Sequence, residues 1–321
     1  MAEVLVLAER SGGMPRKATL ELLTLARRLG EPSALMCGPA DDAIIQELGE
    51  HGAVRVYVVD DPALTDFLVA PKAEALVHVV RRVTPVAVLV TASREGTEVA
   101  ARAAVRLDSG IITGASDVTP GDGGPLVTQS VFSGTWTTQS QVVRGIPIIT
   151  VRPNSVAPEA CPVEPTVEHV TVELSDTACG AQVTRGAPTT TGSLRPALTD
   201  AAVVVAGGRG MGSAEAFGVL ERLADELGGA VAASRAATDL GWYGHDFQVG
   251  QTGKTVTPQL YLASGISGAI QHRAGMQGSH TIVAVNKDAA APIFDIADFG
   301  VVGDAHVVLP ALIDEIGRRK A

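Results

Sequence analysis

Residues 201–213 read AAVVVAGGRGMGS, and this stretch decides the fold of the second half of the chain. The apolar run over 201–206 is typical of a buried strand, and a glycine-rich turn over 207–212 follows it directly. A helix is expected next, over 214–227, and the start of a helix exposes backbone N–H groups that attract anions. The stretch therefore predicts an α/β unit with a candidate ligand site at the turn. A tight turn that binds nothing explains this motif alone equally well.

A second candidate site lies where another apolar strand leads into a helix. Residues 263–272 read ASGISGAIQH. Ser267 can cap the helix expected over 267–274 and can offer its hydroxyl to an anion there. Gln271 and His272 follow one turn later and can face the same cleft. A lone histidine on a helix is more often simply exposed, so the case for a ligand depends on the other glycine and polar clusters of this half.

Strands and helices alternate along most of the chain, which favours parallel sheets with helical crossovers. In the first half, the expected strands are 4–8, 33–37, 54–59 and 86–91, and the expected helices are 15–29, 41–51, 69–83 and 95–107. In the second half, further strands are expected at 230–233, 260–263 and 281–285, and a last helix at 310–318.

The pattern changes after residue 107. Strands are expected at 111–118, 126–132, 137–143 and 146–151, and the sequence between them lacks the pattern of a long helix. We expect these strands to form an antiparallel extension of the first sheet. Residues 184–196 are rich in Thr, Gly, Pro and Ser and are typical of a linker. The sequence thus predicts two α/β domains, 1–190 and 191–321, each a mostly parallel sheet flanked by helices.

Composition narrows the class of protein. The net charge of −10 argues against nucleic acid as the main partner, because neutralising phosphates needs a basic face. Cys37, Cys161 and Cys179 are far apart, which fits a reducing compartment without disulfides or a CxxC metal site. No apolar run approaches the roughly 20 residues that span a bilayer, and the first residues lack the basic start of a secretory signal. We therefore expect a cytoplasmic protein without direct membrane insertion.

Two familiar nucleotide-binding motifs are incomplete in this chain. The dinucleotide fingerprint GxGxxG matches at Gly208 and Gly210, but its last position is Ser213. A P-loop ending in Gly253-Lys254-Thr255 would need another glycine at position 248, which is Gln248. A nicotinamide-dependent dehydrogenase and a nucleotide triphosphatase are therefore both disfavoured.

Several segments taken together resemble the electron transfer flavoprotein α-subunit family, in that family's order and over nearly all of the second half. The first half resembles the family in architecture and in the AER opening at 8–10. The matching segments are 207–210 (GGRG), 233–237 (ASRAA), 249–254 (VGQTGK), 265–272 (GISGAIQH), 284–288 (AVNKD), 291–294 (APIF), 298–300 (DFG) and 303–304 (GD). Departures are Arg273 in place of an apolar residue and Phe299 in place of Tyr.

The resemblance implies that the second domain is Rossmann-like and binds one FAD, whose isoalloxazine ring extends toward a smaller β-subunit. It places Arg235 over the flavin ring, Thr252 near flavin N5 and His272 near the pyrimidine carbonyl, where they would tune the redox potential. Asp304 would meet the adenosine end. The residues implied for the ribityl, pyrophosphate and adenosine portions are Arg209, Ser234, Gln251, Ser267 and Asn286. The remaining implied contacts are Val249, Gly250, Gly268, Ala269, Ile270 and Gln271.

Electrostatics supports the role implied for Arg235. Reduced flavin is anionic in many sites, so a fixed cation beside it favours the reduced form. Two unit charges about 4 Å apart at an effective dielectric near 20 interact by on the order of 4 kcal/mol. Because moving one charge through 100 mV is worth roughly 2.3 kcal/mol, Arg235 could raise the potential by about 100–200 mV, and by less where water screens it.

The resemblance implies an electron carrier rather than an enzyme with its own substrate. Such a carrier takes electrons from flavin dehydrogenases, such as the acyl-CoA dehydrogenases of fatty acid β-oxidation, and delivers them to a membrane quinone oxidoreductase. No general acid/base pair is then expected. Other members support nitrogen fixation or split electron pairs between two flavins, and this chain alone leaves those alternatives open. A non-catalytic nucleotide-binding or sensor module is the alternative outside the family.

Overall fold

The computed structural model describes residues 2–132, 134–184 and 195–320. The chain divides into two compact units, one made of Met1–Gln129 and Thr137–Pro188, the other of Ser130–Trp136 and Thr189–Ala321. Most of the linker expected over 184–196 lies outside the described residues. Both units are built from a sheet and its covering helices, which confirms the predicted α/β fold class. None of the helices in the described ranges has the length and apolar character needed to cross a bilayer.

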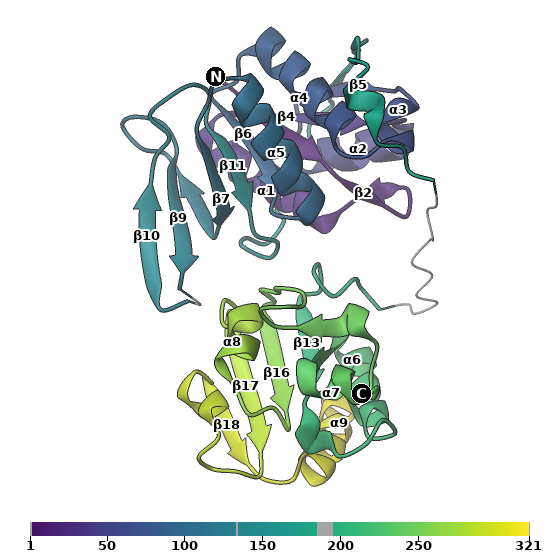
Figure 1. Cartoon of the computed structure of the whole chain (residues 1–321), viewed down its shortest axis with the longest axis vertical. Helices are drawn as coiled ribbons and strands as arrows, with labels where there is room; N and C mark the ends of the chain where they lie inside the picture. Colours follow the sequence, from purple (N-terminus) through teal and green to yellow (C-terminus); the bar gives the residue numbers. More distant parts are fainter. Residues whose placement is uncertain (1, 133, 185–194, 321) are drawn as a thin grey trace. The chain divides into compact units, whose positions relative to one another are not determined.

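Within the described residues, the main sheet of the first unit has seven strands, all parallel, in the order β12-β5-β4-β1-β6-β11-β7 (Figure 1). The strands are β1 (Glu3–Ala8), β4 (Glu31–Cys37), β5 (Arg55–Val59), β6 (Ala87–Thr91), β7 (Ile111–Ala115), β11 (Ile148–Val151) and β12 (Thr166–His169). The strand order reverses at β1, because the chain continues to β4 on one side and later returns to β6 on the other. In open α/β sheets such a reversal marks the usual ligand crevice.

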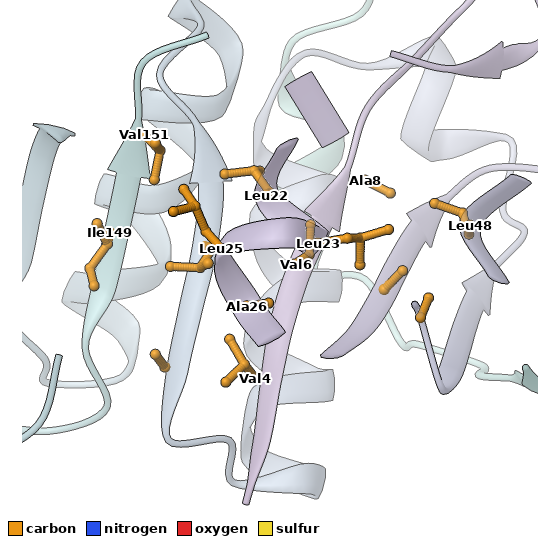
Figure 2. Close-up of a cluster of buried hydrophobic side chains, with 14 of the residues drawn as sticks. Val4, Val6, Ala8, Leu22, Leu23, Leu25, Ala26, Leu48, Ile149 and Val151 are labelled. Carbon is orange, nitrogen blue, oxygen red and sulfur yellow. The ribbon is translucent and has the colours of Figure 1, made fainter. Parts of the chain in front are cut away.

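Helices cover both faces of this sheet, so its strands are apolar on both sides. Val4 and Val6 of β1 pack against α1 and α2, while Leu5 and Leu7 pack against α3, α4 and α5. Figure 2 shows Val4 and Val6 beside the leucines of α1 in the first of these clusters. The helices are α1 (Lys17–Leu29), α2 (Asp42–Glu50), α3 (Ala63–Asp66), α4 (Ala70–Val83) and α5 (Arg94–Arg106).

The expected antiparallel extension of this sheet is wrong in its placement. β7 and β11 lie inside the main sheet and pair in parallel with each other, and β11 also pairs with β6. A separate three-stranded sheet holds β8 (Asp117–Thr119), β9 (Leu126–Val131) and β10 (Trp136–Ser140), with β8 and β9 antiparallel. Parallel neighbours need a long crossover, and here the strands of the small sheet lie in the connection where a helix is usual. A short hairpin of β2 (Arg10–Ser11) and β3 (Met14–Pro15) completes the unit's described strands.

A carboxylate of the chain lies at the strand-order reversal of the first unit. Glu9 directly follows β1, and its Oε1 accepts a hydrogen bond of 2.8 Å from Ser93 Oγ. Ser93 caps α5 by accepting from the Gly96 amide, also at 2.8 Å. The second oxygen of Glu9 lies 2.9 Å from Nη1 of Arg16. The negative charge thus lies at the positive end of α5, where it is electrostatically favourable.

The sheet of the second unit has six parallel strands among the residues described, in the order β15-β14-β13-β16-β17-β18 (Figure 1). Numbered along the chain this is 3-2-1-4-5-6, the order of a doubly wound sheet, and it reverses between β13 and β16. The strands are β13 (Val203–Gly207), β14 (Ala230–Ser234), β15 (Gln248–Val249), β16 (Leu260–Ser264), β17 (Thr281–Asn286) and β18 (Phe299–Val302).

Alternate residues of these strands serve two separate cores. Val205 and Leu262 pack with the helices of one face, α6, α7 and α9. Val204 and Tyr261 pack on the other face with α8 and the segment around Ile293. The helices are α6 (Phe217–Leu227), α7 (Arg235–Asp239), α8 (Ile270–Met276) and α9 (Ala305–Lys320). The last helix begins earlier than the predicted 310–318 and continues through Pro310.

Candidate functional site

A cavity of about 740 Å³ lies in the second unit, at the carboxyl ends of its strands. It is formed by residues that end or follow β13, β14, β15, β16 and β17. In a parallel sheet these ends meet at one edge, and the crevice where the order reverses is the usual ligand position. The volume lies within the roughly 300–1,000 Å³ range of small-molecule and cofactor sites.

Most of the residues predicted for a cofactor line this cavity. They are Arg209, Ser234, Arg235, Val249, Gly250, Gln251, Thr252, Ser267, Ala269, Gln271, His272 and Asn286. Four further lining residues were not among the predicted cofactor contacts: Ala236, Asp239, Gln248 and Asp288. The lining thus combines segments that are more than 70 residues apart along the chain, from Arg209 to Pro292.

Three predicted contacts lie off the cavity lining. Gly268 packs against the backbone of Ile293, where a Cβ would come within 2.3 Å of the Ile293 nitrogen. Ile270 is exposed at the first turn of α8. Asp304 precedes α9, where it accepts the His306 amide at 2.9 Å and pairs with Lys287 at 3.0 Å.

The floor of the cavity holds a buried histidine. His272 is 7% exposed, and its Nε2 lies 2.9 Å from the hydroxyl of Tyr261, which is 0% exposed. Burial lowers the pKa of His272 to about 4, although the nearby Val249 backbone acts in the opposite direction. At neutral pH the ring is therefore uncharged. Its Nδ1 is enclosed by the chain, with the Val249 backbone beside the ring, so this atom does not face the cavity.

A second buried group supports the cavity wall at Thr252. Gln248 donates from its amide nitrogen to the Thr252 hydroxyl at 3.0 Å, and its carbonyl oxygen lies 2.9 Å from the Thr238 hydroxyl. Gln248 is 8% exposed and Thr238 is 2% exposed, whereas Thr252 is exposed. The buried side-chain amide of Gln248 thus fixes the position of the Thr252 hydroxyl at the cavity wall.

The rim carries two arginines. Arg235 is the first residue of α7, and its Nε lies 3.3 Å from Oδ2 of Asp239, with both side chains more than half exposed. Arg209 follows β13 and makes no ion pair within the residues that the structure describes. One rim cation is therefore partly neutralised by the chain itself, and the other is available for an anionic group.

Glycines let two loops meet beneath the cavity. A Cβ on Gly208 would lie 2.2 Å from the carbonyl oxygen of Gly265, and one on Gly210 would lie 2.7 Å from Gly265 Cα. The Gly210 amide donates to that same carbonyl at 2.9 Å. The turn after β13 is therefore fixed against the turn after β16 by direct backbone contact, which any larger residue would prevent.

The loop after β16 differs from the expectation in one detail. The helix begins at Ile270 with Ala269 at its N-cap position, so Ser267 does not cap it. Ser267 is exposed and lines the cavity two residues earlier. Asn286 of β17 holds this loop by donating to the carbonyl of Ile266 at 2.9 Å.

These groups fit a flavin dinucleotide. The cavity is large, it is walled by backbone that approaches closely at glycines, and Arg209 offers a cation to an anionic group. Uncharged polar side chains of the lining, such as Gln251, Thr252 and Asn286, suit the polar atoms of a flavin ring and its ribityl chain. The chain thus provides both an anion-binding rim and a polar floor.

Comparisons with known proteins agree with this geometry. Residues 197–277 match the family model of the electron transfer flavoprotein FAD-binding domain, and residues 4–177 match that of the electron transfer flavoprotein domain. The electron transfer flavoprotein subunit alpha of Mycobacterium leprae is 50% identical over 323 residues, covering 100% of both chains. That of Syntrophomonas wolfei is 39% identical, covering 98% of this chain and 99% of its own. Protein FixB of Clostridium saccharobutylicum is 38% identical, covering 97% and 95%.

The matches extend over the whole length of the chain, and the FAD-binding model covers the segments that build most of the cavity. The chain therefore belongs to the electron transfer flavoprotein alpha subunit family, and its cofactor is FAD.

Proposed function

We propose that this chain is the FAD-carrying subunit of a heterodimeric electron transfer flavoprotein that works in the cytoplasm. The observation that carries the proposal is the cavity at the carboxyl edge of the second sheet, lined by residues from six of the eight segments that carry the family resemblance. Bound FAD would supply the redox chemistry, accepting electrons from one protein and releasing them to another. Membership in the family implies a beta subunit as the partner in the heterodimer.

The main predicted contacts have proposed tasks that follow from their chemistry and location. Arg209 and the backbone amides after β13 would hold the pyrophosphate, and Ser234, Gln251, Ser267 and Asn286 would hold the ribityl and adenosine portions. The residues proposed to lie beside the isoalloxazine ring of FAD are Arg235, Thr252 and His272. Gly268 and Ile270 would act through the loop that they shape, and Asp304 through its ion pair with Lys287.

The residues near the ring suit a carrier whose reduced cofactor is negatively charged. Arg235 would place a cation near the ring, and His272, which burial keeps uncharged, would add no second charge beside it. Hydrogen bonds and cations aimed at developing negative charge stabilise it in a partly buried site. The chain itself would bind, orient and electrostatically tune FAD.

The proposed electron route runs from flavin dehydrogenases, such as the acyl-CoA dehydrogenases of fatty acid β-oxidation, to a membrane quinone oxidoreductase. The support for this route is the family membership and the set of polar groups at the cavity. Electron carriers of this kind need an exposed cofactor edge near a partner surface, and Arg235, Gln251 and Thr252 at the rim are exposed.

The experiment is to co-express the chain with its beta subunit, count flavins in the purified complex, and add an acyl-CoA dehydrogenase with its acyl-CoA substrate. One FAD per complex, with flavin absorbance bleached only when both the dehydrogenase and its substrate are present, is the expected result. A colourless complex would instead favour a nucleotide-binding module. Two flavins per complex, or reduction by NADH alone, would favour an electron-splitting member.

A further inference from the structure

The cavity of the second unit extends to both sides of the point where the strand order reverses. On one side it is lined by residues that end or follow β14 and β15, including Arg235 and Thr252, and on the other by residues that end or follow β17, including Asn286 and Asp288. In the strand order, β15 and β17 are separated by four intervals, or about 19 Å at roughly 4.8 Å per interval. A dinucleotide binds across such a reversal. With the flavin ring beside Arg235 and Thr252, the adenosine end therefore falls near β17.

Two acidic side chains line this cavity among the described residues, and the chain neutralises one of them. Oδ2 of Asp239 lies 3.3 Å from Nε of Arg235. Asp288 makes no ion pair with any residue that the structure describes, because the neighbouring Lys287 pairs instead with Asp304 at 3.0 Å. The β17 end of the cavity thus keeps a negative charge that the described chain leaves uncompensated.

The carboxylate of Asp288 is fixed by one oxygen, which leaves the other available. Oδ1 accepts a hydrogen bond of 2.9 Å from the Ala290 amide, the pattern of an Asx turn. Oδ2 has no hydrogen-bond partner within the described ranges, and the residue is exposed and lines the cavity. An ionised carboxylate only accepts hydrogen bonds. A ligand group at Oδ2 must therefore donate a hydrogen bond, and a negatively charged group is disfavoured there.

Asn286, the other polar side chain at this end, is already engaged by the fold. Its Nδ2 donates to the Ile266 carbonyl at 2.9 Å, and its Oδ1 accepts from the Asp288 amide at 3.0 Å. These two bonds join the loop after β16 to the loop after β17 and hold the backbone of Asp288. The asparagine thus helps to present the carboxylate to the cavity.

We propose that Asp288 binds the ribose in the adenosine half of FAD, with Oδ2 accepting from the ribose hydroxyls. The ribose offers two adjacent, uncharged donors, and an acidic side chain is the usual acceptor for a ribose hydroxyl in dinucleotide-binding sheets. The exposed Pro292 lines the cavity nearby and offers an apolar surface to the flat base. The charge of Asp288 also disfavours the pyrophosphate at this end, which agrees with its proposed location near Arg209. This inference rests on the proposed binding of FAD in the cavity.

The test compares two ligands on the complex with the beta subunit after its flavin has been removed. The ligands are FAD and an FAD analogue whose adenosine ribose is 2′,3′-dideoxy, and binding is followed by the change in flavin fluorescence. The wild-type complex should bind the analogue about 10- to 100-fold more weakly than FAD, as expected when hydrogen bonds to a charged group are lost. Equal affinity for the two ligands would overturn the proposal, and this comparison needs no variant that folds. A wild-type complex that does not bind FAD would instead refute the proposed function.

The variant is Asp288→Asn, which keeps a carbonyl oxygen for the Ala290 amide and removes the charge. It should bind FAD about 10- to 100-fold more weakly than the wild type and should no longer distinguish FAD from the dideoxy analogue. The control is Asp295→Asn, because Asp295 is an exposed acid outside the cavity lining. It should bind both ligands like the wild type. Normal binding of FAD by Asp288→Asn would refute the role of Asp288 and leave the proposed function intact.

Two further measurements distinguish the ribose from other partners of Asp288. In a flavin dinucleotide whose adenine is replaced by hypoxanthine, the exocyclic amino group is missing, and the wild type and Asp288→Asn should differ on it as they do on FAD. A difference that disappears with this ligand would assign the carboxylate to the base and overturn the proposal. The midpoint potential of bound FAD should be unchanged in Asp288→Asn, because about 19 Å exceeds the screening length of about 8–10 Å. A shift as large as that of Arg235→Ala would place Asp288 near the flavin ring and refute the assignment.

Discussion

Arg235 and Asp239 face each other across one turn of α7, with Nε 3.3 Å from Oδ2, and both side chains line the cavity. The arginine that would supply a positive field to the flavin therefore has a fixed anion beside it. Its field at the ring is the resultant of two opposite charges, both screened by water because more than half of each side chain is exposed. This pairing predicts opposite effects for two substitutions.

Replacement of Arg235 by Ala should keep FAD bound but lower its midpoint potential. Two charges about 4 Å apart interact by roughly 1–4 kcal/mol between water-like and protein-like screening, so the fall should be about 40–170 mV. Asp239→Asn should shift the potential in the other direction, because the arginine is no longer neutralised. A spectroelectrochemical titration of the complex measures both, and an unchanged midpoint for Arg235→Ala would refute the role proposed for this residue.

Enlarging Gly208 should damage the cavity from beneath. In Gly208→Ala the new Cβ would lie 2.2 Å from the Gly265 carbonyl oxygen, so the turns after β13 and β16 must separate. We expect a loss of about 1–3 kcal/mol in the free energy of unfolding, together with weaker FAD binding. Gly218→Ala is the control, because a Cβ there meets nothing within 4 Å and the residue lies in α6. That variant should be neutral or slightly stabilised in chemical denaturation, and it should bind FAD normally.

His272 predicts a specific dependence of stability on pH. Its pKa is about 4 in the folded protein, below the 6.5 usual for histidine, so the unfolded chain binds the proton more readily between these values. Stability should therefore be complete above about pH 6.5, fall as the pH decreases to about 4, and level off below, by up to about 3 kcal/mol in total. In His272→Gln this component should disappear. His78→Gln, at an exposed position on α4, should keep the wild-type pH profile of unfolding.

Glu9 should stabilise the first unit more than an ordinary surface acid does. Glu9→Ala leaves the Ser93 hydroxyl and Arg16 without this acceptor near the start of α5, and we expect a loss of about 1–3 kcal/mol. The control is Glu98→Ala, which removes an exposed ion pair with Arg102 on the same helix. That change should cost less than about 1 kcal/mol in thermal unfolding. Equal losses would contradict a special role for Glu9.

The sequence predicted the elements whose pattern is long and regular. Buried parallel strands such as β1 and β6 read as uninterrupted apolar runs, and their predicted bounds agree with the structure within about one residue. The two-residue strand β15 was missed because two residues carry no periodicity. β18 was missed because its residues are mostly exposed at the sheet edge. The location of β7 and β11 depended on pairing between distant segments, which local patterns do not encode.

The site was predictable where a motif carries its own geometry. The turn at 207–212 and the segment 249–252 could be identified because glycine and family resemblance mark them. Asp239 and Gln248 could not, because their location at the cavity follows from how α7 and β15 pack at the sheet edge. Tyr261 read as one more apolar strand residue, since nothing in the sequence shows that its hydroxyl meets a histidine on the next helix. Buried polar pairs of this kind depend on tertiary packing.

Because of the Glu9 carboxylate, the two sheets of this chain differ in whether the polypeptide itself supplies an anion at the strand-order reversal. At its strand-order reversal, the first sheet contains its own anion, whose two oxygens contact Ser93 and Arg16 of the same chain. At the matching edge of the second sheet, Arg209 makes no ion pair with any described residue. We expect the newly made chain to mature in two steps, with the first unit settled before any flavin arrives and the second remaining less protected from hydrogen exchange until it does.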